Sequence, residues 1–174
     1  MDEIESEEDV SSSKRILRYL LDWGIALAFT AIGFWAISAW RTPDLPDQAP
    51  SWSLESLEGE SIALDDYKGK TVVLNFWATW CKPCIMEIPE FKEFSEENPD
   101  IPVFGIAVDG NVAELKRFAA RHKITYPILR ANSDVKKQYK VSSLPMTVII
   151  DPEGEIKDVH IGIMMQQQLE WATR

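Results

Sequence analysis

Long apolar runs and short polar breaks divide the chain from residue 51 onward into strands and helices. Residues 71–77 and 101–108 are predominantly apolar and rich in β-branched side chains, which is typical of strands covered on both faces. A helix is expected over residues 81–97. Another is expected over 111–123, opened by a capping-box pattern of Asn and Glu three residues apart. Shorter strands are expected at 126–129, 146–150 and 155–163, and further helices at 133–139 and from 164 onward.

Turn signals at two places add hairpins to this alternation. Residues 52–54 and 61–64 flank Glu58-Gly59-Glu60, which predicts a short N-terminal β-hairpin. Asp151-Pro-Glu-Gly154 predicts a tight turn between the last two strands. Strands alternating with helices and ending in a hairpin predict an α/β domain at 51–174, with a mixed central sheet flanked by helices.

A different pattern precedes this domain. Residues 23–40 carry no charge and have a tryptophan at each end. As a helix they would cover roughly 26 Å, close to the ~30 Å hydrocarbon layer of a bilayer. We therefore expect a single transmembrane anchor at 14–41. A cleaved signal peptide and a buried core helix are the alternatives, but the apolar run is long for the first and not amphipathic as the second would be.

The flanking charges orient this anchor. Lys14, Arg15 and Arg18 precede the apolar segment, whereas Arg41 alone follows it closely. The positive-inside rule then predicts that the N-terminus is cytoplasmic and that residues 41–174 lie outside the cytoplasmic membrane, in the periplasm or its equivalent. The anchor would be the contact with the membrane.

Composition completes the outline of the domains. The chain has 174 residues, a net charge of −10 and 45% hydrophobic residues, enough for one folded domain. Residues 1–13 are acidic and serine-rich, which predicts a cytoplasmic tail, and residues 42–50 hold three prolines, which predicts a stiff linker. No basic stripe is present, so nucleic-acid binding is not expected.

The only two cysteines, Cys81 and Cys84, fall where the first long strand meets the first long helix. Cys81 is expected at the positive end of the helix dipole, beside Lys82, and both favour the thiolate form. Cys84 follows one turn later on the same face. This arrangement predicts thiol–disulfide exchange, in which Cys81 attacks a client disulfide and Cys84 then resolves the mixed disulfide.

Other uses of the cysteine pair are less favoured. A disulfide that closes a four-residue loop constrains the unfolded chain little. A zinc site would need further ligands, and the only histidines, His122 and His160, are expected at a helix end and in a strand, where surface or packing roles suffice. A two-coordinate Cu(I) carrier remains an alternative. A peroxidase is disfavoured because no T-x-x-C segment occurs, and neither a metal nor a cofactor is predicted.

The stretch Phe76-Trp-Ala-Thr-Trp-Cys-Lys-Pro-Cys84 resembles the active-site segment of the thioredoxin superfamily. This resemblance implies a thioredoxin-like fold and covers the chain from about Asp47 to its C-terminus. Pro89 matches the proline that kinks the active-site helix, and Pro145 matches the cis-proline beside the disulfide. The resemblance further implies that the backbone of Leu144 pairs with an extended client peptide. Trp80, beside Cys81, is expected to cover the disulfide and contact clients.

Two departures from thioredoxin narrow the match. Asn75 replaces a buried acid, and Glu87 stands where thioredoxin has an apolar residue. With these two residues, the anchor and the N-terminal hairpin, the chain resembles the membrane-anchored proteins of the TlpA and ResA type. This resemblance implies exchange with client protein disulfides or thiols outside the cytoplasmic membrane, as in cytochrome c biogenesis or copper-site assembly. It also implies a thiol donor in the membrane that supplies the electrons. A reductase is the leading hypothesis, and a dithiol oxidase of the same fold is the alternative.

Glu87 is expected to take part in the chemistry. It lies three residues after Cys84, so the two side chains meet on one helical face. Apolar neighbours predict that Glu87 is partly buried and can accept the proton of Cys84; an exposed helix glutamate is the alternative. Trp52 and Trp171 are expected in the core.

Overall fold

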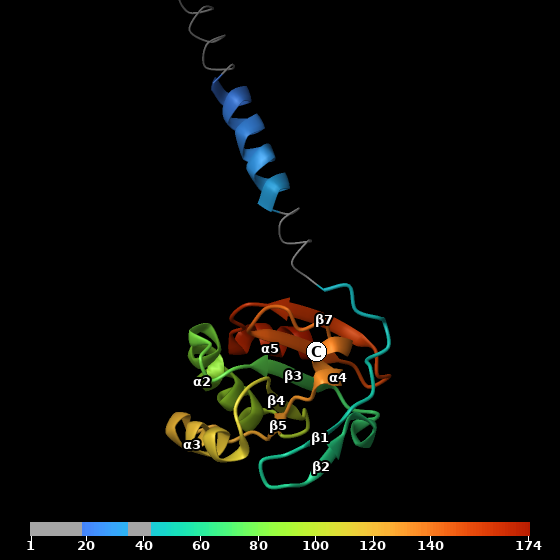
Figure 1. Ribbon diagram of the computed structural model, residues 1–174. Helices are drawn as coiled ribbons and strands as arrows, with labels where there is room; N and C mark the ends of the chain where they lie inside the picture. The colour runs from blue at the N-terminus through green and yellow to red at the C-terminus, as the bar shows by residue number, and fades with distance from the viewer. Residues whose placement is uncertain (1–18, 35–42) are drawn as a thin grey trace, which may run out of the picture. The chain divides into compact units, whose positions relative to one another are not determined.

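The computed structural model describes residues 19–34 and 43–174 (Figure 1). The predicted tail at 1–13 and residues 14–18 and 35–41 of the predicted anchor lie outside the described residues. The chain divides into two compact units, Met1–Arg41 and Thr42–Arg174. In the first, residues 19–34 are helical and expose large apolar side chains from Tyr19 to Phe34. Within the part of the chain that the structure describes, no helix is long and apolar enough to cross a membrane.

The second unit contains a mixed five-stranded sheet in the order β5-β4-β3-β6-β7. The first three of these strands are parallel to one another, and β6 and β7 run antiparallel to their neighbours. The predicted α/β class with a mixed sheet is therefore confirmed. The strands are β3 (Val72–Trp77), β4 (Val103–Ala107), β5 (Ile128–Arg130), β6 (Met146–Ile150) and β7 (Ile156–Ile161).

The predicted N-terminal hairpin is also confirmed, as a separate two-stranded sheet. Its strands are β1 (Ser53–Glu55) and β2 (Ser61–Ala63), and a 3-10 helix at Leu64–Tyr67 follows. The four helices of this unit lie close to their predicted positions. They are α2 (Lys82–Glu97), α3 (Val112–His122), α4 (Ser133–Gln138) and α5 (Gln166–Thr173).

Alternation along β3 assigns these elements to the two faces of the sheet (Figure 1). Val73 packs with residues of α2 and α5, and Trp77 packs with residues of α2 and α3. Leu74 and Phe76 point to the other face, where they join a cluster with the hairpin and α4. β3 is buried on both faces, which explains its continuous apolar run, and its carboxyl end leads directly into the cysteine pair.

The segment before the hairpin lies against one edge of the sheet. Ile156 N donates to the carbonyl of Asp47 at 2.7 Å, and Ala49 N donates to the carbonyl of Gly154 at 2.9 Å. Leu45 packs against the core cluster that contains Leu74 and Phe76. The residues predicted to form a linker, 42–50, therefore contact the domain over part of their length.

The opposite edge of the sheet is contacted by the residues after β1. Ser56 forms an antiparallel bridge with Leu129 of β5, and Leu57 N donates to the carbonyl of Ile128 at 3.2 Å. The N-terminal part of the second unit thus reaches from the β7 edge to the β5 edge across one face of the sheet.

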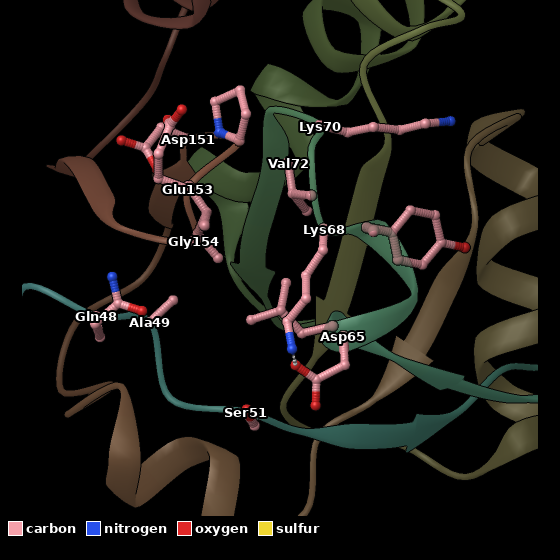
Figure 2. A pocket seen from close by; sticks show the side chains of 14 residues that line it. Gln48, Ala49, Ser51, Asp65, Lys68, Lys70, Val72, Asp151, Glu153 and Gly154 are labelled. Carbon is pink, nitrogen blue, oxygen red and sulfur yellow. Dashed lines mark ion pairs between the residues drawn. The ribbon is translucent and has the colours of Figure 1, made fainter.

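A pocket of about 170 Å³ lies beside the docked segment (Figure 2). Gln48 and Ser51 line one side of it, and Asp65 and Lys68 line the other, with the ammonium of Lys68 at 2.9 Å from Asp65. Val72, the first residue of β3, also lines it. The pocket therefore lies at the end of β3 opposite to the cysteines and is separate from their site.

Leu45→Ala should destabilise the unit at 43–174 by about 1–2 kcal/mol, because a half-buried leucine loses its packing against the core. Urea unfolding followed by circular dichroism measures this change. Pro46→Ala is the matched control: Pro46 is exposed, and its replacement should change the free energy of unfolding by less than about 0.5 kcal/mol. Equal effects of the two substitutions would show that the segment does not contribute through Leu45.

Candidate active site

Cys81 and Cys84 form a disulfide at the start of α2, with their Cα atoms 5.3 Å apart. Cys81 is the N-cap of the helix, as its predicted position at the helix start requires, and the backbone N–H of Cys84 donates to its sulfur at 3.2 Å. Both are buried: Cys81 is 4% exposed and Cys84 is 1% exposed. The sulfur of Cys81 thus receives a backbone N–H of the first helical turn, which favours a negative charge there once the disulfide is reduced.

Three further residues predicted for the site differ in their burial and contacts. Trp80 is 71% exposed directly before Cys81. Leu144 is half-buried and packs against the cluster that contains both cysteines. Pro145 is buried, and the Leu144–Pro145 peptide bond is cis, as the resemblance implied.

Asp109, which the sequence analysis did not identify, fixes the turn before the cysteines. Its carboxylate accepts two hydrogen bonds from Thr79, one from the backbone N–H at 2.9 Å and one from the hydroxyl at 2.6 Å. Asp109 follows the carboxyl end of β4, and Thr79 follows the carboxyl end of β3. Because parallel neighbouring strands end at the same edge of the sheet, this pairing could have been expected from the predicted strands.

Glu87 is 1% exposed, so its predicted burial is confirmed. One carboxylate oxygen accepts a hydrogen bond from the side-chain amide of Asn75 at 2.7 Å, and the other accepts one from the backbone N–H of Met164 at 3.1 Å. The Asn75 amide also lies 3.4 Å from the hydroxyl of the buried Thr147. Asn75, which cannot replace a buried acid as a proton carrier, instead holds the acid that α2 supplies.

Burial raises the pKa of Glu87 from its ordinary value of 4.5 to about 7, while the bonds from Asn75 and Met164 act in the opposite direction. The same environment affects Tyr126, whose pKa is raised by burial and, to a smaller extent, by the charge of Glu87. A carboxyl group with a pKa near 7 exchanges its proton at neutral pH, which is what a general base or acid requires.

The remaining predictions about single residues have mixed outcomes. Trp52 lies in the core as predicted, but the prediction for Trp171 is wrong, because this residue is 81% exposed on α5. α5 has one buried face, formed by Leu169 and Ala172, and Trp171 points away from it. The His122 ring packs against Phe118 in a tilted arrangement, at a centroid distance of 4.2 Å. Among residues 19–34 and 43–174, no three His, Cys, Asp or Glu side chains are grouped closely enough to hold a metal ion.

Comparisons with known proteins point to one class. Over 127 residues the chain is 39% identical to the thioredoxin-like protein YneN of Bacillus subtilis, covering 71% of this chain and 75% of that protein. It is 41% identical over 127 residues to the thiol-disulfide oxidoreductase ResA of Halalkalibacterium halodurans, covering 71% and 72%. The crystal structure of StoA from Bacillus subtilis matches with a TM-score of 0.65 and 27% identity, covering 74% of this chain and all of that one.

A disulfide-forming C-x-x-C pair at the start of a helix, packed in one cluster with the residue before a cis-proline in a mixed α/β fold, defines a thioredoxin-like thiol–disulfide oxidoreductase. The resemblance implied by the sequence is thereby confirmed. More particularly, the chain belongs to the AhpC/TSA family, whose profile matches residues 45–159.

The raised pKa of Glu87 predicts a pH-dependent stability. Between about pH 4.5 and pH 7 the folded protein binds more protons at Glu87 than the unfolded chain does, so stability falls as the pH rises, by roughly 3 kcal/mol in total. Glu87→Gln removes this dependence. The stability of the variant relative to the wild type should therefore increase by about 3 kcal/mol between about pH 4 and pH 8, measured on the oxidised protein by urea unfolding.

Glutamine accepts only one of the two bonds to Glu87, which adds a destabilisation that does not vary with pH. The decisive quantity is therefore how the difference in the free energy of unfolding between variant and wild type changes with pH, and not its value at one pH. Glu93→Gln, an exposed position on the same helix, is the control and should leave the profile unchanged. Parallel profiles for wild type and Glu87→Gln would contradict the assignment.

Proposed function

We propose that this oxidoreductase is a membrane-tethered reductase that uses Cys81 and Cys84 to reduce disulfides of client proteins outside the cytoplasmic membrane. The observation that carries the proposal is the buried Glu87 one helical turn after Cys84. A cysteine pair at a helix N-terminus, with a buried base one helical turn away, has the groups that reduction of a disulfide requires.

The reaction has two exchange steps. The Cys81 thiolate attacks one sulfur of the client disulfide, a bond forms between the two, and the other client sulfur leaves as a thiolate that takes a proton from water. Cys84 then loses its proton to the Glu87 carboxylate and attacks the Cys81 sulfur. The second client sulfur leaves as a thiolate that takes a proton from water. The client has then gained the two electrons that the cysteines lost in forming the Cys81–Cys84 disulfide. A thiol donor in the membrane would reduce this disulfide again.

The charge of Glu87 supports reduction over oxidation. Strongly oxidising exchange proteins owe their potential to a stabilised reduced form, in which a thiolate is favoured. A buried carboxylate one turn from Cys84 opposes thiolate formation there and partly offsets the effect of the helix N-terminus on Cys81. A dithiol oxidase would run the same steps in reverse and would need the opposite electrostatic balance.

Clients would meet the cysteines at an apolar surface. Trp80 is exposed beside Cys81, and Leu144, half-buried before Pro145, has a backbone suited to pairing with an extended peptide. This favours clients that present their disulfide in an unfolded or extended segment. Immature cytochrome c and copper-binding proteins outside the membrane are clients of this kind.

The membrane tether is supported by the first unit. Residues 23–40 carry no charge, and the part of this segment that the structure describes is helical, with its large apolar side chains exposed. A helix that is apolar on all sides needs an apolar surrounding. The bias of Lys14, Arg15 and Arg18 supports delivery of residues 41–174 outside the membrane.

The roles of the two cysteines are tested by trapping. Cys84→Ala should accumulate mixed disulfides with clients in cells, because the first exchange occurs and the resolving thiol is absent. Cys81→Ala should not accumulate them. In the reduced wild type, Cys81 should react with iodoacetamide faster than Cys84 at neutral pH, because its place at the helix N-terminus lowers the pKa of its thiol. Equal trapping by both variants, or equal alkylation rates, would contradict this assignment.

The tether is tested by fractionation. The full chain should remain with membranes after a high-salt wash, since an apolar segment is not released by screening charges. Protease added to intact spheroplasts should digest residues 41–174. The matched control is a chain with Lys14, Arg15 and Arg18 replaced by glutamine, in which this orientation should weaken. Digestion of the domain only after lysis would exclude the proposed orientation.

A further inference from the structure

One peptide group connects the buried carboxylate to a histidine at the edge of the sheet. The Met164 N–H donates to Glu87 at 3.1 Å, and the carbonyl oxygen of the preceding residue, Ile163, lies 3.1 Å from Nε2 of His160. A carbonyl oxygen only accepts hydrogen bonds, so Nε2 of His160 carries the hydrogen and donates it. The N–H of Met164 and the C=O of Ile163 belong to the same planar amide. The hydrogen bonds therefore run without a break from His160 to Glu87.

The strand register places His160 beside the other groups that hold Glu87. Asn75 of β3 is opposite Thr147 of β6, and Thr147 is opposite His160 of β7. Residues directly opposite in antiparallel strands have side chains on the same face of the sheet. Asn75, Thr147 and His160 thus form a polar row across three strands, on the face covered by α2. Glu87 is bound to one end of this row by Asn75 and to the other through the peptide.

A change of charge on His160 is transmitted along this path. Histidine is the side chain that ordinarily gains or loses a proton between about pH 5 and pH 8. A protonated imidazole makes a stronger, charge-assisted bond to the Ile163 carbonyl, and this polarises the amide so that its N–H becomes a better donor. The Met164 N–H then stabilises the ionised form of Glu87 more than the protonated form.

We propose that His160 is a positioning residue that acts on Glu87 through the Ile163–Met164 peptide, and that its charge sets the pH range in which mixed disulfides are resolved. The inference rests on the proposed role of Glu87 as the base for Cys84. When His160 is protonated, Glu87 keeps its carboxylate to lower pH and remains able to accept the thiol proton. The hydrogen-bonded path from His160 to Glu87 thus extends disulfide reduction to mildly acidic pH.

The surrounding charges do not replace His160 in this role. The elements that pack on this face carry charged groups of both signs, and the acids among them disfavour an additional negative charge at Glu87. These groups include the acids Glu90 on α2, Asp158 on β7 and Glu170 on α5, with Tyr126 before β5, and the bases Lys82 and Lys92 on α2, Lys157 on β7 and Arg174 after α5. Lys92 pairs with Glu96, and the ammonium of Lys157 donates to the carbonyl of Arg174. His160 is hydrogen-bonded to the Ile163 carbonyl, so its positive charge acts on the path itself.

The coupling is tested directly by following the carboxyl carbon of Glu87 by NMR against pH in the full chain in detergent. The oxidised protein is used because its cysteines do not titrate, and Glu87→Gln identifies the signal by its disappearance. His160→Gln keeps an N–H donor for Ile163 but cannot become charged. In this variant the midpoint of the Glu87 titration should be about half a pH unit higher, roughly a threefold change in the ratio of its two forms.

The chain provides a matched control in its other histidine. His122→Gln should leave the Glu87 titration unchanged, because His122 packs against Phe118 of α3 and is not part of this hydrogen-bonded path. His160→Ala gives a second test, since it removes the donor as well and should shift the midpoint at least as far. Circular dichroism establishes that each variant is folded. An identical Glu87 midpoint in the wild type and in the folded His160 variants would overturn the inference.

A kinetic arm separates this inference from the proposed function. The rate at which a mixed disulfide with a cysteine-containing peptide is resolved should fall more steeply toward acid pH in His160→Gln than in the wild type. Glu87→Gln should slow resolution and make the rate insensitive to His160→Gln. If Glu87→Gln leaves the rate unchanged, the base role of Glu87 fails, whereas the NMR midpoints still decide whether His160 controls Glu87. If Glu87→Gln slows resolution but His160→Gln alters neither midpoint nor profile, only the further inference is wrong.

Discussion

The two hydrogen bonds to the Glu87 carboxylate connect three parts of the domain that are far apart in the sequence. Asn75 lies on the central strand, Glu87 on the helix that carries the cysteines, and Met164 on the segment before the last helix. An ionised carboxylate without these donors would be strongly destabilised at this depth. The carboxylate therefore requires that β3, α2 and the segment before α5 keep their relative positions. Because α2 carries the cysteine pair, the same contacts fix the position of the pair.

Much of this arrangement could be predicted because the signals are local. The apolar run of β3 indicated a strand covered on both faces, and the Asn111–Glu114 capping box, now seen as two reciprocal hydrogen bonds, located the start of α3. Cys81 could be placed at a helix N-terminus because a strand and a three-residue turn precede it. The burial of Glu87 followed from its apolar neighbours on one helical face.

The rest depended on contacts between distant segments, which have no signature in a single sequence. The Met164 N–H and the Ile163 carbonyl are backbone groups, so no residue type at those positions marks their role. Asn75 could be recognised as a replacement for an acid but not as a donor to Glu87 until α2 was packed over β3. Trp171 was misjudged because its large apolar side chain suggested burial, although α5 is short and buries only one face.

The N-terminal residues of the domain affect what the sheet can bind. The outer strands β5 and β7 would each leave a row of unpaired backbone groups, to which extended segments of other chains could add. Asp47 and Ala49 occupy part of the β7 edge, and Ser56 and Leu57 occupy part of the β5 edge. Under the proposed function the protein meets clients with extended segments, which could add to such edges and start an aggregate. The partial cover of both edges leaves fewer backbone groups free for the addition of a further strand there, away from the redox pair.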